Sequence, residues 1–178
     1  MKYMNIIVAT DKNWGIGKDN DLLFHYKEDM DVFKQLTMYN LVIMGKNTLL
    51  SLPKQMPLKN RLNLVLTTDE ELKNQYKDIQ DIMFVKSIPE LFLVLDDLIK
   101  NTNLTEDKIW CIGGGSIYKQ LLHYCKYAYV NRCDKEYEAD TFFPNLNDNE
   151  DWRCDRIQIC KTAPLTYLIY ENTKVKER

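Results

Sequence analysis

The chain has 178 residues, a formal net charge of −2 at pH 7 and 45% hydrophobic residues. This size and composition fit one globular domain, residues 1–178, and exclude long disorder and collagen-like repeats. The charge balance leaves no excess of basic residues to bind DNA. Single-stranded RNA is excluded less firmly, because the 11% of aromatic residues could stack on bases. We expect no nucleic-acid partner.

Short apolar segments, often β-branched, alternate along the chain with segments of helical pattern. The predicted strands are residues 6–9, 41–44, 62–66, 82–85, 109–112 and 127–130. The predicted helices are residues 26–38, 46–52, 89–100 and 116–125, and residues 68–81 form a solvated loop with room for a short helix. This alternation predicts an α/β fold with a mainly parallel central sheet and helices on both faces.

The C-terminal part of the chain follows a different pattern. Residues 156–160 and 166–170 both have strand character, and no helical segment separates them. This arrangement predicts an antiparallel hairpin that closes one edge of the sheet.

The chain shows no sign of a membrane segment or a metal site. No stretch approaches the roughly 18 apolar residues that cross a bilayer, and residues 6–9 are too short for a signal-peptide core. The five cysteines are an odd number without a CxxC pair, and only two histidines are present. This pattern argues against a disulfide framework and against zinc. We expect a cytoplasmic protein without membrane association or metal.

The six glycines fall in three places. Gly15 and Gly17 frame one loop, Gly45 follows the strand 41–44, and residues 113–115 follow the strand 109–112. The last two are strand–glycine–helix junctions, where the backbone can approach a ligand and offer free N–H groups to phosphates. A single junction can equally be a tight turn, but three consecutive glycines cost backbone entropy. Neither a Walker A motif nor a GxGxxG fingerprint is present.

One carboxylate occupies an unexpected place. On a helical wheel of residues 26–38, at about 100° per residue, Asp29 lies among Tyr26, Met30 and Phe33 on the apolar face. Burying a carboxylate is costly unless it is paired or neutralised. One interpretation is that Asp29 forms an internal hydrogen bond or ion pair that only fixes the packing of the helix. The other is that its carboxylate lies in a pocket for a cationic or amidine-like ligand.

Together these features resemble the dihydrofolate reductase family across residues 5–170. The similar segments, in chain order, are a mobile loop at residues 15–22, an acid and an aromatic residue within 29–33, a cofactor junction at 42–48, Arg61, a second junction at 112–118 and Asp-Thr-x-Phe-Pro at 140–144. The family has a cis peptide bond between the first two glycines of the second junction. Each motif alone is weak, whereas six in the right order are a strong signal.

Three departures from the family pattern stand out. Leu23 replaces a proline, which should loosen the backbone there. Asn131 occupies the position of a threonine that supports the acid, and its amide can still hydrogen-bond Asp29. The loop at residues 53–60 is longer by two residues. None of these changes removes a central group.

The resemblance implies hydride transfer from NADPH to C6 of 7,8-dihydrofolate with protonation at N5, which supplies tetrahydrofolate for one-carbon and thymidylate metabolism. Asp29 would anchor the pterin, a water admitted near Leu22 would deliver the proton, and Arg61 would hold the substrate's α-carboxylate. The implied substrate contacts are Ile7, Val8, Ala9, Met30, Phe33, Leu52, Leu58, Arg61, Ile112, Tyr118 and Asn131.

For the cofactor, the resemblance implies that Lys46 and the hydroxyls of Thr67 and Thr68 meet the 2′-phosphate of NADPH. The implied cofactor contacts are Ala9, Ile16, Gly17, Gly45, Lys46, Asn47, Thr48, Thr67, Thr68, Lys86, Gly113, Gly114, Gly115, Ser116, Ile117 and Thr141. The expected partners are dihydrofolate and antifolate small molecules, bound by a monomer.

Two other functions are compatible with the sequence. A reductase of riboflavin biosynthesis has the same fold, but it would not require both Asp29 in a helix and Arg61 at the start of a strand. A non-catalytic module that retains the fold is compatible with Leu23 and Asn131, although the intact acid, arginine and glycines argue against it.

Overall fold

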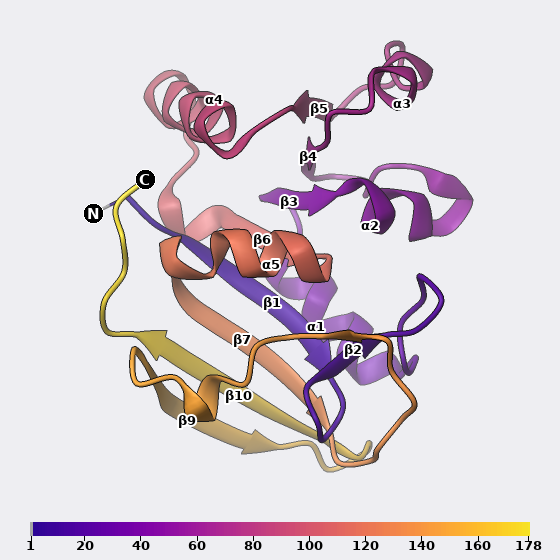
Figure 1. The fold of residues 1–178 in the computed structure, drawn as a ribbon, viewed down its shortest axis with the longest axis vertical. Coiled ribbons are helices and arrows are strands. Elements are labelled where there is room, and N and C mark those ends of the chain that lie inside the picture. Colours follow the sequence, from indigo (N-terminus) through magenta and orange to yellow (C-terminus); the bar gives the residue numbers. More distant parts are fainter. Residues whose placement is uncertain (1) are drawn as a thin grey trace.

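The computed structural model describes residues 2–178 (Figure 1). In this part of the chain an eight-stranded sheet has the order β5-β4-β3-β6-β1-β7-β10-β9. Its strands are β1 Met4–Thr10, β3 Leu41–Gly45, β4 Leu62–Leu66, β5 Ile82–Val85, β6 Ile109–Gly113, β7 Cys125–Cys133, β9 Trp152–Ile159 and β10 Leu165–Asn172. Neighbouring strands from β5 to β7 pair in parallel, whereas β10 is antiparallel to both β7 and β9. The predicted parallel sheet and C-terminal antiparallel hairpin are therefore confirmed.

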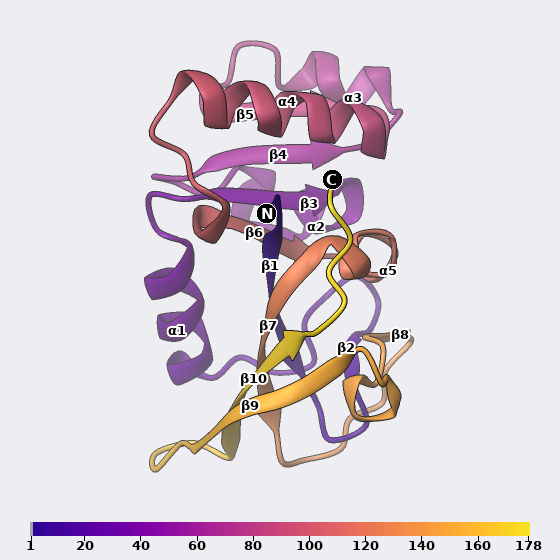
Figure 2. The same cartoon turned by 90° about the vertical axis from the view of Figure 1, so that its left-hand side faces the viewer.

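Helices cover both faces of the sheet, as expected. They are α1 Lys27–Thr37, α2 Lys46–Ser51, α3 Glu70–Gln75, α4 Ile88–Asn101 and α5 Gly115–Leu121, with 3-10 turns at Pro53–Gln55, Glu106–Lys108, Leu122–Tyr124 and Leu146–Asp148. Apolar side chains of α4 and α5 belong to one core cluster, and those of α1, α2 and α3 belong to another. Figure 2 shows α1 and α5 on opposite sides of the sheet.

The strand order places a topological switch beside β1. The chain adds β3, β4 and β5 progressively outward, and it then returns with β6 into the gap between β3 and β1 before β7 extends the sheet on the other side. Ligands of open α/β sheets bind at the carboxyl ends of strands where the order reverses. The ends of β1, β3 and β6 are therefore where a site is expected.

Two local details differ from the sequence prediction. The helix expected at residues 116–125 ends at Leu121, a 3-10 turn follows, and Cys125 already begins β7 because it pairs with Met4 of β1. The short helix that the sequence allowed within residues 68–81 is present as α3. A two-stranded sheet, β2 Gly15–Gly17 with β8 Thr141–Phe142, was not predicted because its strands are too short to show a period.

Within residues 2–178, no helix combines the length and the apolar character needed to cross a bilayer.

Replacing Leu95 of α4 by alanine should lower the free energy of unfolding by about 2–5 kcal/mol, because its fully buried side chain fills the core between α4 and the sheet. Leu93 on the same helix is 72% exposed, so Leu93→Ala should change stability by less than about 0.5 kcal/mol. Urea unfolding of both variants measures the difference. Equal losses would contradict this packing of α4.

Candidate functional site

The predicted carboxylate lies buried between α1 and the sheet. Asp29, in the first turn of α1, is 4% exposed, and Asn131 of β7 donates a hydrogen bond from Nδ2 to Asp29 Oδ1 at 2.7 Å. Asn131 itself pairs with Ala9 at the carboxyl end of β1. Among the residues that the structure describes, none hydrogen-bonds Asp29 Oδ2. The amide therefore supports the acid, as the sequence suggested, and leaves one oxygen for a ligand.

Burial controls the charge of this carboxyl group. Removal from water disfavours the anion and raises the pKa of Asp29 above its usual value, while the Asn131 hydrogen bond and the nearby His25 act in the opposite direction. No salt bridge to Asp29 occurs within residues 2–178. A buried acid without a cationic partner is poised to accept hydrogen bonds from a ligand or to take up a proton.

Arg61, directly before β4, is buried and fixed from several sides. Its Nε donates to Thr37 Oγ1 at 3.0 Å, its Nη1 donates to the Lys59 carbonyl at 2.8 Å, and the guanidinium carbon lies 5.8 Å from the centre of the Phe33 ring. Burial lowers the pKa of Arg61, and no acid of the described chain pairs with it. A fixed cation without a counter-ion suits a carboxylate ligand.

Thr37 was missed by sequence reasoning. Its fully buried hydroxyl donates to the Phe33 carbonyl at 2.7 Å and accepts from Arg61, so it links α1 to the arginine. A threonine at the end of a predicted helix gives no signal for this role, because back-bonding to the carbonyl four residues earlier is common in helices.

A cavity of about 140 Å³ opens at the carboxyl ends of β1 and β6. Five of the expected residues at the substrate side line it, namely Val8, Ala9, Leu22, Ile112 and Tyr118. Tyr118 donates from its hydroxyl to the Ile7 carbonyl at 2.8 Å, which fixes the ring against the end of β1. Leu22 is 46% exposed and lies on the loop that rims this cavity.

The remaining expected substrate contacts lie outside this cavity. Met30 of α1 is 45% exposed, whereas Phe33, Leu52 and Leu58 are half-buried in the cluster between α1, α2 and the sheet. Neither Asp29 nor Arg61 lines the 140 Å³ cavity. Their grouping into one substrate site therefore stays a prediction.

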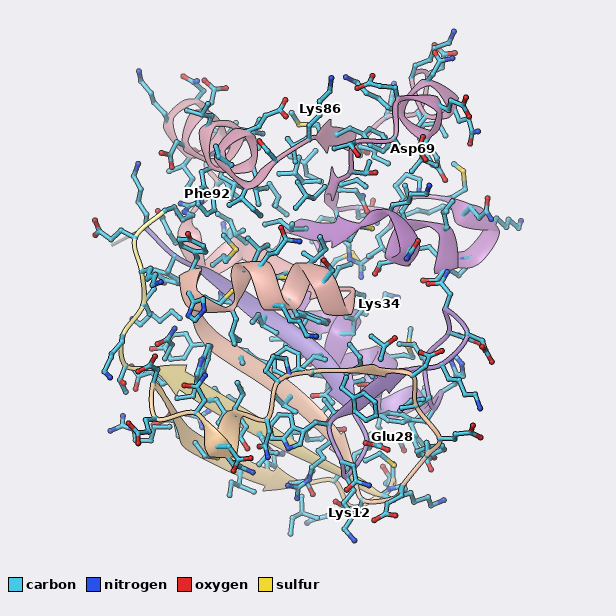
Figure 3. The ribbon with its side chains drawn as sticks, viewed as in Figure 1. Lys12, Glu28, Lys34, Asp69, Lys86 and Phe92 are labelled. Atoms are coloured by element: carbon cyan, nitrogen blue, oxygen red, sulfur yellow. The ribbon has the colours of Figure 1, made fainter. Side chains whose placement is uncertain are left out.

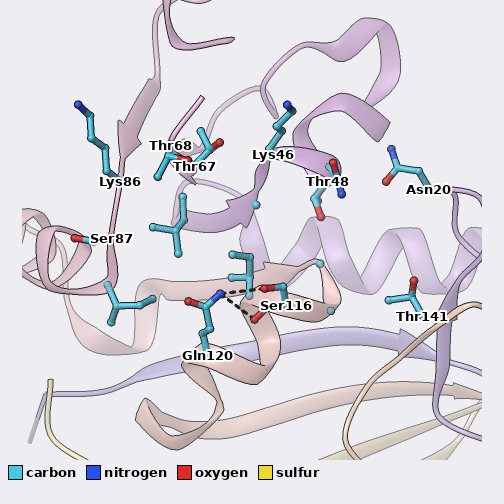
Figure 4. Close-up of a pocket in the computed structure, with 17 residues that line it drawn as sticks. Asn20, Lys46, Thr48, Thr67, Thr68, Lys86, Ser87, Ser116, Gln120 and Thr141 are labelled. Carbon is cyan, nitrogen blue, oxygen red and sulfur yellow. Dashed lines mark hydrogen bonds between the residues drawn. The ribbon is translucent and has the colours of Figure 1, made fainter. Parts of the chain in front are cut away.

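A larger cavity of about 560 Å³ lies beside the first and shares lining residues with it (Figure 4). Twelve of the expected cofactor contacts line it: Gly45, Lys46, Asn47, Thr48, Thr67, Thr68, Lys86, Gly114, Gly115, Ser116, Ile117 and Thr141. Ala9, Ile16 and Gly17 line the smaller cavity, and Gly113 lines neither. Sequence reasoning missed Asn20, Leu66, Ser87, Ile88 and Gln120, whose residue types carry no specific signal.

Glycines of both junctions line the larger cavity and pack closely against neighbouring side chains. A Cβ atom added at Gly45 would lie 2.9 Å from the Ile117 side chain, so a larger residue there would force the two junctions apart. Gly113 has φ of +117°, a conformation that other residues rarely adopt, and the expected cis bond joins it to Gly114. With hydroxyls, amides and two lysines on its walls, this cavity has the size and donor set for a dinucleotide.

The loop over the smaller cavity is held by the segment that contains the Asp-Thr-x-Phe-Pro motif. Asp140 accepts a hydrogen bond from the Asp19 amide at Oδ2 (2.9 Å), and its own amide donates to the Gly17 carbonyl at 3.0 Å. β2 and β8 pair next to these contacts. The motif therefore fixes the base of the loop that carries Leu22.

Residues 2–178 contain no group of three or more His, Cys, Asp or Glu side chains arranged to hold a metal ion.

A buried carboxylate and a dinucleotide-sized cavity at the switch point of an α/β sheet are the features of a nucleotide-dependent oxidoreductase. The family model for dihydrofolate reductase matches residues 3–171. Dihydrofolate reductase of Sus scrofa is 36% identical over 160 residues, which cover 81% of this chain and 80% of that one. That of Staphylococcus haemolyticus is 31% identical over 150 residues, covering 84% and 81%.

A solved structure of similar fold supports the same assignment. Dihydrofolate reductase from Enterococcus faecalis, complexed with NADP(H) and RAB-propyl, superposes with a TM-score of 0.75 and 25% identity over 96% of each chain. This chain belongs to the dihydrofolate reductase family.

Replacing Asp29 by asparagine should stabilise the fold more at pH 8 than at pH 4. Because the folded-state pKa of Asp29 is raised, the folded state holds its proton more tightly than the unfolded state. Ionised Asp29 lowers the free energy of unfolding. This loss is absent below the usual pKa of the unfolded state, grows as the pH rises to the raised pKa of the folded state, and is constant above it. Asparagine can still accept the Asn131 hydrogen bond.

Urea unfolding at the two pH values measures this effect, with Asp31→Asn on the exposed face of α1 as the matched control. A stability difference that is the same at both pH values would show that Asp29 is not destabilised by burial.

Proposed function

We propose that this protein catalyses NADPH-dependent reduction of 7,8-dihydrofolate to 5,6,7,8-tetrahydrofolate. The observation that carries the proposal is the buried Asp29–Asn131 pair, which adjoins Ala9 of β1 on the wall of the small cavity. The small cavity in turn shares lining residues with the larger one. Membership of the dihydrofolate reductase family supports it. The finer expectations of a folate-type substrate, a monomer and a cytoplasmic setting belong to the same proposal.

Asp29 would bind the pterin ring through two adjacent donors, its N3–H and 2-amino group. Each carboxylate oxygen can accept more than one hydrogen bond, so Oδ1 can keep its bond to Asn131 while it receives one from the ring. The negative charge next to the heterocycle favours its protonated, reactive form. Asn131 would keep the carboxylate in the orientation that such paired binding requires.

Arg61 would bind the α-carboxylate of the substrate's glutamate. Thr37 and the Lys59 carbonyl fix two of its nitrogens, and Nη2 has no hydrogen-bond partner within residues 2–178. The Phe33 ring of α1 lies next to this arginine, and it would face the middle of the substrate. Asp29 and Arg61 would thus hold opposite ends of one elongated ligand.

NADPH supplies the hydride when it is bound. Gly45 and the second junction would approach its phosphates, and Lys46, Thr67 and Thr68 would meet its 2′-phosphate. α2 and α5 have only six and seven residues, so backbone N–H groups at close range matter here more than a helix dipole. The 140 Å³ cavity between Ala9, Ile16 and Tyr118 would receive the nicotinamide end.

The proton for N5 would come from a water molecule beside Leu22. Among the described residues, the one carboxylate on the lining of the 140 Å³ cavity is Asp21, which lies on the exposed loop. The half-exposed Leu22 side chain is placed to admit or exclude water as the loop moves. Asp29 would raise ring basicity without delivering the proton itself.

NADPH consumption that depends on dihydrofolate tests the proposal. The wild-type protein should oxidise NADPH only when dihydrofolate is present, and Asp29→Asn should lower kcat by roughly 10²-fold or more, because the anionic contact to the ring is lost. Asp31→Asn should leave kcat unchanged. Turnover of a ribosylamino-pyrimidine phosphate instead would favour the riboflavin-pathway reductase, and turnover of neither substrate would favour the non-catalytic module.

Replacing Arg61 by leucine should raise the Kd of dihydrofolate about 10- to 100-fold, because a charge-assisted contact to the α-carboxylate is lost. Fluorescence titration measures this value. A 2,4-diaminopyrimidine inhibitor without a carboxylate serves as the control ligand, since its Kd should not change. Equal weakening of both ligands would indicate a disturbed fold, and no change in either would refute the assigned contact.

A further inference from the structure

The two cations of the larger cavity are already paired. Lys46 and Lys86 are the only charged side chains on its lining among the described residues. Lys46 Nζ lies 2.5 Å from Asp69 Oδ2, and Lys86 Nζ lies 2.7 Å from Glu70 Oε1. Figure 4 shows the two lysines on either side of Thr67 and Thr68, at the wall assigned to the 2′-phosphate. The local charge of these four side chains sums to zero.

Both acids come from the start of α3 and lie behind the lysines. Neither Asp69 nor Glu70 lines the cavity itself. Figure 3 labels Asp69 and Lys86 in this outer part of the molecule, near α3 and β5. The acids therefore act on a ligand through the lysines and not by contact.

Asp69 is fixed by the backbone around it. Its Oδ1 accepts a hydrogen bond from the Leu72 amide at 2.9 Å and caps α3, and its own amide donates to Thr67 Oγ1 at 3.2 Å. The hydrogen bond from Lys46 lowers the pKa of Asp69, and the one from Lys86 lowers that of Glu70, so both stay ionised at neutral pH. Asp69 is therefore held in place by backbone contacts, whereas the Glu70 side chain is exposed and contacts Lys86 alone among the ion pairs of the described residues.

We propose that Asp69 and Glu70 are positioning residues that reduce selectivity for a 2′-phosphate over a plain ribose hydroxyl. A 2′-phosphate has to compete with each carboxylate for its lysine, and after that exchange it lies near two uncompensated negative charges. A ribose hydroxyl meets neither cost. This inference rests on the proposed function only in that the larger cavity takes the adenosine end of the cofactor.

The experiment compares two adenosine ligands on the protein without folate. Adenosine 2′,5′-bisphosphate and adenosine 5′-monophosphate are titrated calorimetrically into wild type, Asp69→Asn, Glu70→Gln and the double variant. Each substitution should tighten the bisphosphate by roughly 3- to 5-fold, the size of an exposed ion pair, and leave the monophosphate unchanged. Asparagine is also a good N-cap, so Asp69→Asn keeps α3. The gain should shrink at high salt.

Glu71→Gln is the matched control, because it removes the same charge from the same turn of α3, and Glu71 pairs with neither lysine. It should leave both affinities unchanged, whereas an equal gain in this variant would assign the effect to net charge and overturn the proposal. An unchanged or weaker bisphosphate affinity in Asp69→Asn and Glu70→Gln would overturn it too, as would absence of binding by both ligands. A selective gain in a protein without dihydrofolate-dependent turnover would support this inference and refute the proposed function.

Discussion

The hydrogen bond from Asn131 to Asp29 joins the two parts of the molecule on which the site depends. It ties α1, which covers one face of the sheet, to β7, the first strand beyond the switch point. An unpaired carboxylate at this depth would be costly, and one neutral amide offsets only part of that cost. The fold therefore tolerates a destabilised group where a ligand with two donors would complete its hydrogen bonds. Binding sites commonly contain groups that lower the stability of the fold in this way.

The rest of the site is arranged around that constraint. Arg61 is a second buried charge without an opposite charge, and Thr37 and Phe33 of α1 hold it in place. The same helix thus carries Asp29 and holds Arg61 in place. On the other side of β1, glycines of the junctions after β3 and β6 pack closely against neighbouring side chains and line the larger cavity. Under the proposed function, helix α1 would organise the groups that bind the substrate, and the strand ends would organise those that bind the cofactor.

The sequence predicted the sheet, the helices and the location of the charged groups because these features have local signals. Buried strands are apolar, and Asp29 interrupts an apolar helix face. The pairing of Lys46 with Asp69 and of Lys86 with Glu70 had no such signal, because residues 23 and 16 positions apart meet only after β4 and β5 align. Likewise, the end of α5 at Leu121 depends on the register of β7 against β1 and not on helix propensity.

The hydrogen bond from Tyr118 to the Ile7 carbonyl has a mechanical consequence. Tyr118 belongs to the helix that follows the triple glycine, and Ile7 belongs to the central strand that carries the substrate wall. Together with the pairing of β1 and β6, this hydrogen bond fixes the position of the second glycine junction relative to β1. Under the proposed function, the two reactants would meet on this shared frame, so a displacement at either junction would change the distance that the hydride has to cross.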